Sequence, residues 1–256
     1  YNFYLSHRLW FAGSSISSVY NILNIRNQTF GYGVTYVSVP GIEKRIDRTE
    51  MPISIYEDKM ILGLFAFNKN VLELLNIGSS LKVLSLNIEK YSTLLFSIDL
   101  GISGKLLDVV PLGFSIKNIG SDLNLSRKFN KFPQPFMFSF GASYKQILQD
   151  SNNENYLLYA LDLSKSNNNY PVIKFGLEYK PFKVLLFRAG YNYFLENQIN
   201  FNTNIFLGMG IKVGTLSLDY SFVPAGDLGY SQSLSLSIGT DSLMPKFEKN
   251  ASWHRL

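Results

Sequence analysis

The chain has no cysteine, only two histidines and little charge. The absence of cysteine excludes disulfide bonds and thiolate metal sites throughout its 256 residues. Aspartate, glutamate, lysine and arginine together make up 17% of the sequence, below the proportion of about a quarter that is usual in soluble domains. A water-exposed surface normally carries more charge, so this composition favours a surface that faces lipid in part.

Long apolar runs and concentrated basic patches are also absent. No stretch approaches the roughly 18 uninterrupted apolar residues of a transmembrane helix, which leaves a closed β-barrel as the way to span a bilayer. The 24 basic residues exceed the 19 acidic ones, giving a net charge of +5, but they are scattered along the chain. Nucleic-acid binding usually needs a concentrated patch, so we expect no nucleic-acid partner. Nothing in the composition predicts a cofactor.

Aromatic residues are abundant, and apolar side chains recur at every second position. The chain has 16 tyrosines and 20 phenylalanines. Strands of a membrane barrel alternate lipid-facing apolar residues with lumen-facing small or polar ones. Residues 203–213 are typical. Their apolar face carries Ile205, Leu207, Met209, Ile211 and Val213, and their other face carries Asn204, Gly208, Gly210 and Lys212.

The alternation predicts an all-β protein, a transmembrane antiparallel β-barrel of about fourteen strands. An even number is expected for a single-chain barrel of this kind. The predicted strands cover residues 1–9, 15–24, 29–39, 57–68, 75–87, 91–102, 110–119, 136–148, 155–164, 171–181, 184–194, 203–213, 215–223 and 231–239. Residues 1–239 would form the barrel, and 240–256 a C-terminal tail outside its wall. Residues 16–25 and 59–68 do not alternate cleanly, and 71–77 are predicted to form a short helix or a loop.

The predicted connections fall into two groups. Residues 180–183 and 213–215 are tight turns, expected on the periplasmic side. Residues 40–52, 120–134, 149–154 and 195–202 are longer and polar, and are expected outside the cell.

A soluble β-sandwich is the competing interpretation, because its strands alternate as well. Two features count against it. The polar faces are rich in glycine and serine and poor in lysine and glutamate, unlike a solvated sandwich face. Aromatic residues also recur near the strand ends, as an interfacial girdle requires. Examples are Tyr144, Tyr179, Tyr193, Tyr220 and Phe222.

Several motifs resemble a known family. Residues 218–231 read LDYSFVPAGDLGYS and are similar to the closing hairpin of the PorV/PorQ family, relatives of the FadL long-chain fatty-acid transporter. Residues 112–120 (LGFSIKNIG), 140–145 (FGASYK), 160–165 (ALDLSK), 175–179 (FGLEY) and 187–191 (FRAGY) resemble strands of that family in the same order. The resemblance covers residues 75–239 well and 1–70 loosely. The Asn-Pro-Ala motif of the family's N-terminal hatch does not occur in this sequence.

The resemblance implies a bacterial outer-membrane location, contact with the lipid bilayer, and passive transport of hydrophobic small molecules such as fatty acids. The PorV branch implies a different role, as an accessory barrel of type IX secretion that handles secreted proteins. A structural barrel or surface antigen is the third reading.

Charged residues on the predicted lumen face are the candidate site residues. They are Asp99, Lys145, Lys174, Glu178, Arg188, Lys212 and Asp219. Charges in a membrane protein face inward, so they either form ion pairs that wet the interior or contact a ligand. Arg188 and Lys212 would bind a ligand carboxylate, with Lys174, Glu178 and Asp219 as further candidate contacts.

The chain offers little for catalysis. The two histidines, His7 and His254, have no evident metal-ligand company, and no serine motif accompanies His7 as a hydrolytic triad would require. We therefore expect no enzyme and no metal site. Gly226, Asp227 and Gly229 fit the turn of the closing hairpin, where a structural role is expected.

Overall fold

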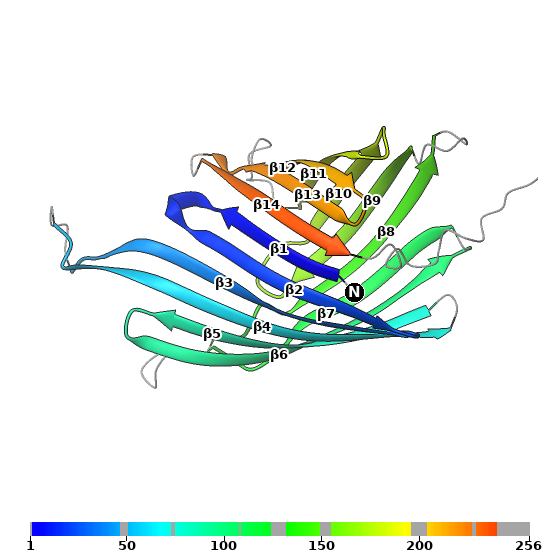
Figure 1. Cartoon of the computed structure of the whole chain (residues 1–256). Helices are drawn as coiled ribbons and strands as arrows, with labels where there is room; N and C mark the ends of the chain where they lie inside the picture. The colour runs from blue at the N-terminus through cyan, green and yellow to red at the C-terminus, as the bar shows by residue number, and fades with distance from the viewer. Residues whose placement is uncertain are drawn as a thin grey trace, which may run out of the picture.

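The computed structural model describes residues 2–46, 51–72, 75–107, 109–123, 132–148, 155–195, 204–226 and 229–239. These residues form one closed antiparallel barrel in which each strand pairs with its neighbours in the chain (Figure 1). The first and last strands close the ring, in register from Asn2 opposite Gly239 to Leu9 opposite Gln232. Closure pairs every strand on both sides, so the sheet has no open edge.

The fourteen predicted strands are all present. They are β1 (Asn2–Leu9), β2 (Ser15–Ile25), β3 (Gln28–Lys44), β4 (Ser54–Leu72), β5 (Leu75–Ile88), β6 (Tyr91–Leu106), β7 (Val110–Gly120), β8 (Met137–Ile147), β9 (Tyr156–Ser166), β10 (Val172–Lys180), β11 (Leu185–Phe194), β12 (Ile205–Val213), β13 (Leu216–Pro224) and β14 (Tyr230–Gly239). A single 3-10 turn, η1 (Phe11–Gly13), joins β1 to β2. No helix in the described part of the chain is long and apolar enough to cross a membrane.

Two predicted connections are wrong. The predicted loop over residues 40–52 is partly strand, because β3 continues to Lys44 through a bulge between Val39 and Ile42. Gly41 has φ +73° there, a conformation that glycine adopts at no steric cost. Where a helix or loop was predicted over residues 71–77, residues 71–72 end β4 and residues 75–77 begin β5, and residues 73–74 lie outside the described residues. Because β3 and β4 stay paired as far as Lys44 and Ser54, their hairpin projects beyond the other strands (Figure 1).

The strand order fixes which connections share an end of the barrel. Turns that follow even-numbered strands lie at the end where β1 begins and β14 stops, which we call the terminal end. The connection from β8 to β9, expected among the outside loops, follows an even-numbered strand, so β8 ends and β9 begins at the terminal end; residues 149–154 themselves lie outside the described residues. Strands β3, β7 and β11 end at the opposite end, called the loop end. The tail 240–256 lies outside the described residues.

The two faces of the wall differ as the alternation predicted. Outward side chains are large, apolar and exposed, for example Phe140 (50%), Phe175 (51%) and Leu207 (51%). Inward positions carry small polar residues such as Ser139 (9%) and Ser164 (5%). Among the described residues the buried apolar side chains are just Leu86, Leu95 and Leu186. A β-sandwich would hide its apolar faces in a packed core, so that alternative is excluded.

Candidate functional site

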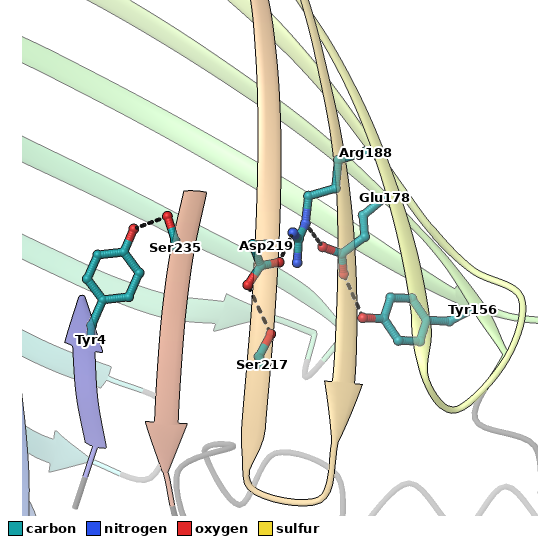
Figure 2. A network of polar contacts seen from close by, with 7 residues as sticks. All are labelled: Tyr4, Tyr156, Glu178, Arg188, Ser217, Asp219 and Ser235. Carbon is teal, nitrogen blue, oxygen red and sulfur yellow. Dashed lines mark hydrogen bonds and ion pairs between the residues drawn. The ribbon is translucent and has the colours of Figure 1, made fainter. Parts of the chain in front are cut away.

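Arg188 is the centre of an inward-facing ionic network on β9–β13. Its Nε donates to Glu178 Oε2 and its Nη1 to Asp219 Oδ1, both at 2.6 Å (Figure 2). The Tyr156 hydroxyl donates to the other oxygen of Glu178 at 2.6 Å, and Ser217 Oγ donates to Asp219 Oδ2 at 2.9 Å. Three of the seven candidate residues, Glu178, Arg188 and Asp219, are therefore bound to one another.

Glycines on β12 let this network form. Glu178 lies directly opposite Arg188, but Asp219 is two strands away from it, across β12. Gly208 faces Arg188 and Gly210 faces Asp219 in the register. A Cβ on Gly210 would lie 2.5 Å from Asp219 Oδ1 and 3.4 Å from Arg188 Nη1. The missing side chains on β12 are thus what allows the guanidinium to reach the second carboxylate.

Of the other candidate residues, Lys174, Lys212 and Asp99 lie apart from this network, whereas Lys145 contacts its Tyr156. Lys174 Nζ is 3.3 Å from Asp162 Oδ1 on the neighbouring strand β9. Lys212 faces inward opposite Ser217, and its ammonium has no side-chain partner in the part of the chain that the structure describes. Lys145 lies 4.3 Å from the centre of the Tyr156 ring, and Lys180 lies 5.6 Å from it. Arg188 already binds two carboxylates, so Lys212 is the better placed of the two predicted anion contacts.

A second ionic cluster joins β5, β6 and β7. Lys82 Nζ lies 2.6 Å from Asp99 Oδ1, and Ser80 donates to Asp99 Oδ2 at 3.0 Å. The backbone N–H of Asn118 donates to Asp99 Oδ1 at 2.9 Å. Asn118 has φ +61° beside a bulge in the β6–β7 pairing. Asp99 was expected in the lumen. Lys82 was missed, although the alternation of Ser80 and Lys82 with Leu81 and Val83 would have found it.

Leucines also face the lumen, on the wall formed by β4, β5 and β6. Leu62, Leu84 and Leu95 lie opposite one another in the register, in the same inward row as Thr35 and Ser18. Leu64 and Leu86 extend this leucine patch to the adjoining rows. Lumen faces of membrane barrels are usually polar, so an inward apolar surface needs a reason. The patch is also why residues 59–68 do not alternate: both faces of β4 are apolar.

Hollows lie along the inner wall of β2–β10, among them three that the described residues form. Their volumes are ≈ 340, ≈ 390 and ≈ 490 Å³. Glycines form much of their floor, and the polar residues lining them include Asn68, Asp99, Asp162 and Lys174.

The remaining candidates have structural surroundings. His7 faces outward and its Nδ1 lies 2.9 Å from Ser17 Oγ, while His254 is outside the described residues. No group of three or more potential metal ligands occurs in the described ranges. Gly226 (φ +60°) and Gly229 (φ +92°) both adopt left-handed conformations in the closing hairpin, which agrees with the structural role expected for them. Asp227 lies outside the described residues.

A closed barrel with an apolar outer face and a polar, partly hollow interior defines a transmembrane β-barrel. Among solved structures it is similar to the toluene transporter TodX of Pseudomonas putida, with a TM-score of 0.61, 13% identity, and coverage of 92% of this chain and 87% of that one. The toluene transporter TbuX of Ralstonia pickettii has a TM-score of 0.56 at 12% identity, covering 93% of this chain and 87% of that one. The chain therefore has the FadL-like barrel fold. No family model and no curated protein sequence matches it.

Proposed function

We propose that this protein is a bacterial outer-membrane channel for the passive transport of small hydrophobic molecules. The observation that carries the proposal is the leucine patch. Its five side chains point into the lumen, where a purely aqueous pore would have polar groups. Apolar side chains that face a lumen favour contact with apolar ligands. Likeness in fold to TodX and TbuX, both named as toluene transporters, supports the same reading.

The patch makes the proposal testable by substitution. The double variant Leu62→Asn, Leu84→Asn replaces two half-buried inward side chains of the patch with polar ones of similar size, whereas Leu86 and Leu95 are buried and are left unchanged. Uptake of toluene and of a long-chain fatty acid into liposomes holding the purified barrel is expected to fall about thirtyfold, because each of the two lost apolar contacts weakens binding by roughly 1 kcal/mol.

The matched control is Leu186→Asn. It changes an inward leucine on β11 that is 7% exposed and lies away from the patch. It should transport like the parent barrel. Transport that is equal in all three proteins, each shown to be folded by its heat-modifiable migration, would remove the proposal.

The finer assignment, to the PorV/PorQ branch, is also a proposal. It rests on the closing hairpin over residues 218–231 and on the strand motifs that precede it. Recovery of secretion-system subunits or secreted cargo with the barrel from native membranes would favour a protein-handling role. A barrel recovered alone but active in hydrocarbon uptake would favour transport.

A further inference from the structure

The hollow of ≈ 390 Å³ on the inner wall has a floor made of glycines from four adjacent strands. Gly78 on β5 pairs with Gly101 on β6, and Gly113 on β7 pairs with Gly141 on β8. Around this floor stand polar side chains, including Ser115, Ser139 and Lys117. We call it the glycine-floored hollow.

Neither backbone conformation nor packing explains these glycines. None of the four has a positive φ. A Cβ on Gly101 would meet nothing closer than the Phe114 carbonyl oxygen at 3.7 Å, and one on Gly113 nothing closer than the Ile102 oxygen at 4.0 Å. Both are ordinary contacts, in contrast to the 2.5 Å clash at Gly210. Glycine weakens a strand interior, and neither conformation nor packing requires it at these positions. What the absent side chains do provide is space on the lumen side of the wall.

An unpartnered hydroxyl lines that space. Ser139 is 9% exposed, and no side-chain hydrogen bond of it exists within the described ranges. It lies opposite Ser115 in the register, and both serines line the hollow. The Ser139 Oγ is not among the buried polar atoms without a partner in the described residues, so it is open to the hollow. Ser139 can find a hydrogen-bond partner in a molecule that occupies the hollow.

The charge of the hollow points to the kind of molecule. Lys117 is half-buried, lines the hollow and has no ion-pair partner among the residues described. Asp162, also in the lining, forms an ion pair with Lys174 at 3.3 Å, although its Oδ1 has no hydrogen-bond partner in the described residues. Asp99 lines the neighbouring hollow of ≈ 340 Å³ and is paired with Lys82 at 2.6 Å. One positive charge is left over, beside hydroxyl donors.

We propose that the glycine-floored hollow is a binding site for a small oxyanion, a carboxylate or a phosphate. The Lys117 ammonium would supply the charge and the Ser139 hydroxyl would donate a hydrogen bond, as oxyanion sites require. This polar site is separate from the leucine patch. It is measured by binding, without transport, so its failure and that of the proposed channel are distinguishable.

The test is ligand-observed NMR on the purified barrel in a neutral detergent, with inorganic phosphate, acetate and uncharged glycerol as probes. Saturable binding of phosphate or acetate is expected, with glycerol unbound, and the tighter of the two anions identifies the class. Lys117→Met should weaken binding about tenfold, the factor that a charge-assisted hydrogen bond contributes. Gly113→Leu should weaken it at least as much, because the new side chain fills the hollow. Ser139→Ala should weaken it less.

Two variants serve as matched controls. Lys69→Met removes a cation on the outward, exposed face of β4, and Gly63→Leu fills an outward glycine position where a Cβ would meet only the Val83 oxygen at 3.9 Å. Both should bind like the parent. The proposal is overturned if neither anion binds saturably, if glycerol competes equally, or if Lys117→Met binds unchanged. Should Gly113→Leu fail to fold, Lys117→Met and Ser139→Ala decide the outcome.

Discussion

The wall formed by β10–β13 and the wall formed by β4–β6 line the same lumen with different chemistry. The first carries Arg188 between Glu178 and Asp219, with glycines that make room for their contacts. The second carries the leucine patch on the inside and apolar residues such as Ile61 and Phe65 on the outside. The inward charged side chains of β10–β13 bind one another. On β4–β6, the half-buried Leu62, Leu64 and Leu84 face the lumen, where a ligand can contact them. Substitution should therefore affect stability on the first wall and transport on the second.

The largest effect on stability is expected from Arg188→Met. It leaves Glu178 and Asp219 without their cation, and removing one partner of a buried pair costs about 3–5 kcal/mol. Arg188 is 41% exposed to the lumen, so water screens the loss and we expect roughly 1–3 kcal/mol. Urea unfolding of the barrel in lipid vesicles measures it.

A control for that experiment is the triple change Arg188→Met, Glu178→Gln, Asp219→Asn, which removes the carboxylate charges as well. It should recover part of the loss. If Arg188→Met is as stable as the parent, the ionic wall does not hold the barrel together and the contrast between the walls fails.

A smaller effect is expected from Gly210→Ala. The new Cβ would lie 2.5 Å from Asp219 Oδ1 and would force the carboxylate away from Arg188, at a cost of about 1–2 kcal/mol. Gly63→Ala on β4 is the matched control, because its Cβ would have no neighbour closer than 3.9 Å. Equal unfolding midpoints for the two variants would contradict the role given to Gly210.

The smallest effect is expected for an ion pair outside the lumen. At the projecting end of β4, hydrogen bonds from Ser38 and then from Lys59 lower the pKa of Glu57 below its ordinary value of 4.5. A lowered pKa means that the stabilisation is complete above the unfolded-state pKa and is lost as the pH falls through the folded-state value. Ser38→Ala should raise the Glu57 pKa, as followed by carboxyl NMR between pH 3 and 6 (roughly the window around a normal glutamate pKa). Unfolding midpoints at pH 7 should hardly change, since exposed pairs contribute little.

The contrast between the walls also explains what the sequence could predict. On β10–β13 the outward and inward residues differ in polarity, so the strands, their faces and the inward charges were all predicted. Period-two alternation carries no such signal on β4, where Met60, Leu62 and Leu64 face inward between outward Ile61 and Phe65. A strand with two apolar faces in a barrel of otherwise polar interior was the available sign of the leucine patch.

Which inward side chains contact one another depends on the register between strands. The sequence of a single strand does not determine that register. Arg188 reaches Asp219 because of how β11, β12 and β13 are staggered, and because position 210 is glycine. Lys82 meets Asp99 through the offset between β5 and β6. Lumen location could be deduced from alternation alone, but partners could not.

The pairing of Asn2 with Gly239 has a consequence for how the protein is made. The barrel can close only after β14 has been synthesised. One edge of β1 therefore stays unpaired while the twelve strands between β1 and β14 are made. Contacts this distant in sequence form slowly, and bare strands invite aggregation. A chain shortened by its last hairpin would keep two such sides permanently, and we expect it to be degraded rather than inserted.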